Sequence, residues 1–202
     1  MTDDIQVHLI DDDEAMRDSM GFLLESADLS CRTYSTARAF LEVAETLTQG
    51  CVVSDVRMPE MSGLQLVKEV RAREFGLPVI MITGHGDVAL AVEAMKAGVA
   101  DFIEKPFDDE ALLSSIKRVL AGDAGASAAR EAAANFTTLL AALSPRENEV
   151  LEGVVAGKIN KVIAYDLGIS PRTVEVYRAN VMSKMGATSL SELVRMSILA
   201  GV

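Results

Sequence analysis

Groups suited to phosphoryl chemistry follow four short apolar runs of the sequence. They are the three aspartates that begin at Asp11, then Asp55 at the end of CVVSD, Thr83 at the end of VIMIT, and Lys105 within DFIEKP. Carboxylates that lie close together repel one another and need compensation by positive charge. A carboxylate nucleophile beside a cation, a lysine and a hydroxyl can accept a phosphoryl group, because that transfer needs positioning and charge neutralisation more than acid–base catalysis.

An oxygen-liganded divalent cation is the compensation that this cluster favours. Mg²⁺ typically binds through one or two carboxylates plus water and phosphate, and Lys105 would balance a further oxygen as a point charge. For Asp11–Asp13 taken alone, a solvated helix start is an equally good interpretation, since acidic side chains offset the helix dipole there. The sequence has no GxxxxGK[ST] loop, so a nucleotide is not the expected phosphoryl source.

The elements that would position these groups alternate along residues 1–121. Four runs, IQVHLI, CVVSD, PVIMIT and DFIEKP, have strand length, and two of them are almost wholly apolar, as in a sheet covered on both faces. Helical spacing follows in Ala15–Ala27, Leu64–Val70 and Val88–Met95, whereas residues 35–50 have no clear pattern. Five alternations predict a doubly wound α/β domain with a five-stranded parallel sheet, in which functional groups gather at the carboxyl ends of the strands.

The pattern changes after residue 121. Residues 122–138 are rich in alanine with interspersed glycine, which predicts a partly helical linker. Residues 139–202 have no strand pattern. Ser-Pro pairs at 144–145 and 170–171 predict two helix starts. The turn LGIS joins two short helical segments, so an all-α domain with a helix-turn-helix motif is expected.

The net charge of −11 is divided unevenly between the two halves. Residues 1–123 hold 23 acidic and 11 basic residues, whereas residues 124–202 hold 7 and 8. The acidic half would repel a phosphate backbone, so any DNA contact is expected in the second half. Since that half is nearly neutral, a specific DNA interface is expected to need two copies.

Composition argues against several other classes. No apolar run approaches the roughly 20 residues of a membrane span, and the N-terminus lacks the basic region of a signal peptide. Two cysteines are too few for a disulfide scaffold, and the two cysteines and two histidines do not have the spacing of a zinc site. We expect a cytoplasmic protein without membrane contact.

Both halves resemble known families. HLIDDDEAM, SDVRMPEMSGLQL, VIMITGHGD and DFIEKPF resemble the receiver domain of two-component response regulators. The stretch from SPRENEV to VMSKMGA resembles the LuxR-type helix-turn-helix domain. Together they resemble the NarL/FixJ family, and the linker with SPRTVEVYRANVMSKM is similar to the nitrogen-fixation regulators within it. The resemblance implies a flavodoxin-like receiver over 1–121 and a DNA-binding domain over 139–202.

The resemblance also implies a role for each group of the cluster. Asp55 would accept the phosphoryl group. Asp11, Asp12, Asp55 and the backbone carbonyl of Arg57 would be the ligands of Mg²⁺ or Mn²⁺. Lys105 would contact the phosphate. Thr83 and Phe102 would form a switch, in which Phe102 turns inward on phosphorylation.

The implied partners are a sensor histidine kinase, a second copy of the phosphorylated chain, double-stranded DNA with a two-fold site, and RNA polymerase. The family expectation is transcriptional activation. Catalysis would be limited to the chain's own phosphorylation and slow autodephosphorylation.

Candidate DNA contacts lie on two neighbouring helices. The helix from Pro171 to Met185 is expected to enter the major groove by its N-terminal half. Positions facing the groove are Arg172, Thr173, Glu175, Val176, Arg178 and Ala179, and candidate backbone contacts at the preceding helix are Lys158, Asn160 and Lys161. An exposed helix with mixed charges is the alternative for any single residue, whereas Val174, Val181 and Met185 have core spacing.

Two other functions compete with this interpretation. An aspartyl-phosphate phosphatase would also use Asp55 as its nucleophile, but that class has a second acid two residues later, where this chain has Arg57. A constitutive DNA binder with a receiver as a protein-interaction scaffold would have no need to keep all four of Asp12, Asp55, Thr83 and Lys105. The stability of the phosphoryl group and the DNA affinity without phosphate distinguish these functions.

Overall fold

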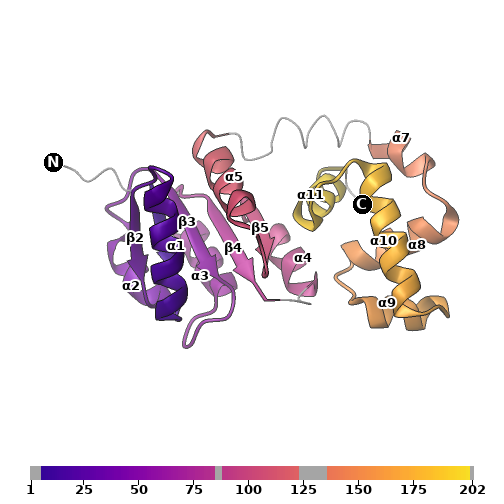
Figure 1. Cartoon of the computed structure of the whole chain (residues 1–202), viewed down its shortest axis with the longest axis horizontal. Coiled ribbons are helices and arrows are strands. Elements are labelled where there is room, and N and C mark those ends of the chain that lie inside the picture. The colour runs from indigo at the N-terminus through magenta and orange to yellow at the C-terminus, as the bar shows by residue number, and fades with distance from the viewer. Residues whose placement is uncertain (1–5, 85–87, 123–135, 201–202) are drawn as a thin grey trace. The chain divides into compact units, whose positions relative to one another are not determined.

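The computed structural model describes residues 6–84, 88–122 and 136–200 and divides the chain into two compact units (Figure 1). The sheet unit includes residues 6–84 and 97–122, and the second unit groups residues 88–96 with residues 136–200. We call residues 136–200 the helical unit.

Five parallel strands form the sheet unit, in the order β2-β1-β3-β4-β5. Their bounds are β1 Val7–Ile10, β2 Cys31–Tyr34, β3 Cys51–Asp55, β4 Val79–Thr83 and β5 Asp101–Glu104. The predicted doubly wound sheet is therefore confirmed. β1 and β4 are buried along their whole length, and β3 is buried up to Asp55, which accounts for their apolar character.

Helices alternate with the strands along the chain (Figure 1). They are α1 Glu14–Ser26, α2 Ala37–Ala44, α3 Gly63–Ala72, α4 Val88–Ala97 and α5 Asp109–Leu120. α1 and α5 share one core with alternate strand residues: Met20, Leu24, Leu112 and Ile116 pack with Val7, Leu9, Val53, Ile80 and Ile82. The side chains on the other face of β1 point toward α2. There the ring of His8 lies 5.8 Å from the ring of Phe40.

The helical unit contains the predicted helix-turn-helix. Its helices are α7 Phe136–Ala141, α8 Pro145–Val155, α9 Asn160–Leu167, α10 Pro171–Met185 and α11 Leu190–Ala200. Ser144 and Ser170 cap α8 and α10 as the Ser-Pro pairs predict, and Gly168 ends α9 at a φ of 65°. Val174, Val181 and Met185 lie in the core of the unit. Within the described ranges no helix is long and apolar enough to cross a membrane.

Ordered packing of the helical unit begins inside the range predicted as linker. Phe136 is 1% exposed and belongs to the core of the unit, although the sequence places it in residues 122–138. Residues 123–135, which make up most of the predicted linker, lie outside the described residues.

A partly buried ion pair joins α8 to α10 and makes the helical unit sensitive to acid. Lys184 Nζ lies 2.7 Å from Glu147 Oε2, which also accepts a hydrogen bond from the Ser144 backbone N–H at 2.6 Å. These bonds, that of Lys184 foremost, lower the pKa of Glu147 from 4.5 to about 2. Because the folded pKa is the lower one, this stabilisation is complete above pH 4.5 and is lost as the pH falls toward 2.

We therefore expect the melting temperature of the helical unit to fall between pH 4.5 and 2 by more in the wild type than in Glu147→Gln. Thermal unfolding of the two full chains, followed by circular dichroism across this pH range, measures the difference. Parallel curves would contradict the assigned role of Glu147.

Candidate phosphoacceptor site and DNA-binding face

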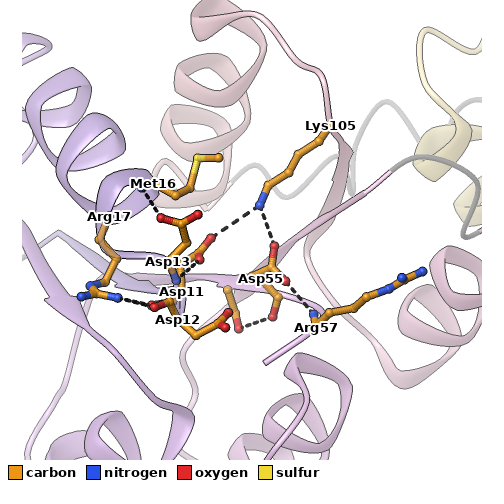
Figure 2. A network of polar contacts seen from close by, with 9 residues as sticks. Asp11, Asp12, Asp13, Met16, Arg17, Asp55, Arg57 and Lys105 are labelled. Atoms are coloured by element: carbon orange, nitrogen blue, oxygen red, sulfur yellow. Dashed lines mark hydrogen bonds and ion pairs between the residues drawn. The ribbon is translucent and has the colours of Figure 1, made fainter. Parts of the chain in front are cut away.

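Three predicted site residues meet at the carboxyl edge of the sheet (Figure 2). Lys105 Nζ lies 2.7 Å from Asp55 Oδ1 and 3.5 Å from Asp11 Oδ2, so one ammonium contacts two carboxylates. Asp11 follows β1, Asp55 ends β3, and Lys105 follows β5. Parallel strands bring these positions together although they are far apart in the sequence.

The loop after β1 is held by an arginine that the sequence did not indicate. Arg17 Nη1 donates to the backbone oxygens of Asp11 and Asp12, at 2.8 and 3.0 Å (Figure 2). The carboxylate of Asp13 caps α1 by accepting from the Met16 N–H. The helix-start interpretation is therefore correct for Asp13, whereas Asp11 is directed to Lys105. Asp12 is exposed.

The loop after β3 presents the Asp55 side chain. Its Oδ2 accepts a hydrogen bond of 2.6 Å from the Arg57 backbone N–H, and the Ser54 hydroxyl donates to its backbone oxygen at 2.9 Å. The first residue of α3, Gly63, donates its N–H to the Val56 oxygen. A Cβ at Gly63 would overlap the backbone oxygen of Asp55. Glycine is therefore needed here for the close approach of α3 to the backbone of Asp55.

Gly63→Ala is expected to destabilise the sheet unit by about 1–3 kcal/mol, because the added methyl must displace the backbone at Asp55. Urea unfolding of the full chain measures the loss. Gly21→Ala is the matched control, since a Cβ at that α1 position would have only an ordinary contact of 3.9 Å to Thr33. That variant is expected to stabilise the unit by up to about 1 kcal/mol. Equal effects of the two changes would contradict the packing argument.

The charges of the cluster are partly desolvated. Burial raises the pKa of Asp11, while the Asp13 N–H and Lys105 oppose the rise. For Lys105, burial disfavours the ammonium, but Asp55 and Asp11 outweigh it and raise its pKa. Asp11 Oδ2 is buried without a hydrogen bond, and the Lys105 ammonium 3.5 Å away offsets its charge.

The donor set fits a hard divalent cation. Asp11 and Asp55 offer carboxylate oxygens at one edge, and the buried Oδ2 of Asp11 has unused accepting capacity. Among residues 6–84, 88–122 and 136–200, however, no three acidic, histidine or cysteine side chains are grouped closely enough to hold a metal ion. Lys105 instead lies between two of the three predicted carboxylate ligands.

The predicted switch residues occupy one face of the sheet. Thr83 ends β4 and is 1% exposed, and Phe102 lies on β5 and is 7% exposed. Because Phe102 pairs with Met81 in the register of β4 and β5, Phe102 and Thr83 project to the same side. The ring of Phe102 is thus already buried, so the expected inward turn is not needed to bury it.

Most of the predicted DNA contacts on α10 lie on its exposed surface. Arg172, Glu175, Val176 and Ala179 are exposed, and Thr173 and Arg178 are half-buried. On the preceding segment, Lys158 Nζ pairs with Asp166 at 2.8 Å. Lys161 is exposed. Asn160 accepts a hydrogen bond from Arg178. This contact joins two predicted DNA-binding residues, and no sequence pattern predicts it.

Comparison with known proteins agrees with this division. Residues 7–117 match the response regulator receiver domain family, and residues 141–197 match the luxR family of bacterial regulatory proteins.

Relatives match along the whole chain. The transcriptional regulatory protein FixJ of Azorhizobium caulinodans is 55% identical over all of this chain and 96% of its own length. The C4-dicarboxylate transport transcriptional regulatory protein DctR of Rhodobacter capsulatus is 44% identical over 95% of this chain and 98% of its own. The crystal structure of full-length FixJ from B. japonicum has a TM-score of 0.57 and 50% identity, covering 99% of this chain and 98% of that one. The chain thus belongs to the two-component response regulators that join a receiver to a LuxR-type DNA-binding domain, and it is a phosphorylation-dependent transcriptional regulator.

Proposed function

We propose that Asp55 is the phosphoryl acceptor and that a sensor histidine kinase is the donor. The observation that carries this proposal is the contact of Lys105 Nζ with both Asp55 Oδ1 and Asp11 Oδ2. In the transfer, a carboxylate oxygen of Asp55 forms a bond to phosphorus while the bond from phosphorus to the kinase histidine breaks. The histidine nitrogen keeps the electron pair and takes up a proton. Lys105 then balances charge on a phosphoryl oxygen.

We assign metal binding to Asp11, Asp12 and Asp55 with the backbone carbonyl of Arg57. Mg²⁺ or Mn²⁺ bound there would supply positive charge to the phosphoryl oxygens. The buried, unbonded Oδ2 of Asp11 supports the assignment. Arg17 holds the loop that carries two of these ligands, so it is a positioning residue for the site.

The output of the site is proposed to be a change in assembly. Thr83 and Phe102 would respond to the phosphoryl group as parts of a two-state domain. The receivers would then pair, and two DNA-binding domains would contact a two-fold site on double-stranded DNA. The sequence divides the chain into a receiver over 1–121, a linker over 122–138 and a DNA-binding domain over 139–202. Because Phe136 lies in the core of the helical unit, we propose that the DNA-binding domain begins at or before Phe136.

Activation of transcription with RNA polymerase, and control of nitrogen-fixation genes, follow from the family resemblance and belong to the same proposal. No enzyme activity is proposed beyond the chain's own phosphorylation and slow autodephosphorylation. A phosphatase is disfavoured because Arg57, two residues after Asp55, offers an exposed cationic side chain and its N–H, not a second acid.

The test uses the full chain with acetyl phosphate and Mg²⁺. Peptide mass spectrometry is expected to locate the phosphoryl group on Asp55, and light scattering is expected to show a dimer only after treatment. Modification at another residue would overturn the acceptor assignment. Dimerisation and DNA binding that do not depend on phosphate would favour the scaffold function.

A further inference from the structure

A hydrogen bond joins the two helices of the helix-turn-helix motif at its predicted DNA face. Arg178 Nη1 lies 2.8 Å from Asn160 Oδ1, and the bond is partly buried. Asn160 is the first residue of α9, and Arg178 lies in the middle of α10. A guanidinium can only donate hydrogen bonds, so the amide oxygen of Asn160 must be the acceptor.

This bond restricts the arginine more than the helix alone would. An arginine side chain has many rotamers, and its planar fork recognises a phosphate or a guanine edge only when the plane is correctly oriented. Since α9 and α10 are packed on one core, an acceptor on α9 fixes one edge of the guanidinium relative to the helix that enters the groove.

The neighbouring cations of α9 are arranged differently. Lys158 pairs with Asp166 within its own segment, and both side chains are about 40% exposed, where ion pairs contribute little. Lys161 follows Asn160 directly and is exposed. Asn160 is therefore distinguished from the other predicted backbone contacts by its bond to a residue of the recognition helix.

We infer that Asn160 is a positioning residue: it acts on DNA through Arg178, whose guanidinium it orients, and not through a phosphate contact of its own. The inference rests on the proposed use of α10 as the recognition helix. It replaces the independent backbone contact that the sequence predicts for Asn160.

A double-mutant cycle on DNA affinity tests the inference. The probe is a duplex selected from randomised DNA by the full wild-type chain after treatment with acetyl phosphate and Mg²⁺. Arg178→Ala is expected to weaken binding about tenfold and Asn160→Ala about fivefold. The double variant is expected to match Arg178→Ala, because Asn160 has nothing left to orient. Both single variants should change the salt dependence of binding in the same direction.

The control pair is Lys161→Ala with Arg178→Ala. Their losses of DNA affinity are expected to multiply, because Lys161 is predicted to contact the DNA backbone independently of Arg178. Multiplying losses for Asn160→Ala and Arg178→Ala, about 50-fold together, would overturn the inference, as would an unchanged affinity in either single variant. Asn160→Ser, too short to reach Arg178, replaces Asn160→Ala where that variant fails to fold. If the wild-type chain selects no duplex, the proposed recognition of DNA by α10 is wrong, and the inference about Asn160, which rests on it, is overturned as well.

Discussion

Asp55→Asn is expected to abolish phosphate-driven dimerisation and the accompanying gain in DNA affinity, while leaving the fold intact. The amide has nearly the shape of the carboxylate but cannot form the acyl phosphate under the same conditions, because it lacks the nucleophilic oxygen anion. Lys105 keeps its second partner, Asp11, in this variant. The measurement is light scattering and duplex binding of the full chain, with and without acetyl phosphate and Mg²⁺.

Asp13→Asn provides the matched control for this experiment. It makes the same chemical change in the same acidic part of the chain, at a residue whose structural task is to cap α1. Asparagine caps helices about as well as aspartate, so this variant is expected to respond to the phosphodonor like the wild type. A response that persists in Asp55→Asn, or one that is lost equally in both variants, would show that Asp55 is not the acceptor.

The sequence predicts the acidic site well because topology alone brings strand ends together. Asp55 and Lys105 are 50 positions apart, yet each comes at the end of a strand in one parallel sheet, and they are in contact. What the pattern cannot give is the path of the loops. The two hydrogen bonds from Arg17 to the backbone oxygens of Asp11 and Asp12 depend on how the chain turns after β1.

The strand signal is missing at β2 because its middle residues face solvent, whereas the other edge strand, β5, is largely buried. β2 pairs with only one neighbour, β1. Its residues Arg32 and Thr33 are exposed, so CRTY lacks the apolar run that identifies a buried strand. α2, which follows it, has only eight residues, and a helix of that length leaves a short periodic signal.

In the helical unit, local signals were sufficient for the helices but not for their contacts. Ser144, Ser170 and Gly168 mark helix ends through their own backbone and side-chain chemistry. The bond between Asn160 and Arg178 joins residues 18 positions apart on two helices, and no periodicity encodes it.

Phe136→Ala is expected to unfold the helical unit while the sheet unit keeps its structure. The side chain is 1% exposed and lies in the core with Val150, Leu151 and Val181. Truncation of a buried phenylalanine costs about 3–5 kcal/mol through lost apolar burial and the cavity left behind. A unit of roughly 65 residues has a total stability of only about 3–10 kcal/mol, so this loss is comparable to the whole.

Two-dimensional NMR spectra of the full chain separate the two units. In Phe136→Ala the signals of the helical unit should lose their dispersion, duplex binding should disappear, and the signals of β1, β3 and β4 should stay in place. Thr138→Ala, at an exposed position of the same helix α7, should change stability by no more than about 0.5 kcal/mol. If both variants behave alike, α7 is part of the linker and the domain begins at residue 139. If only Phe136→Ala unfolds the unit, the domain begins at or before Phe136, because truncating a side chain outside the core of a domain does not unfold that domain.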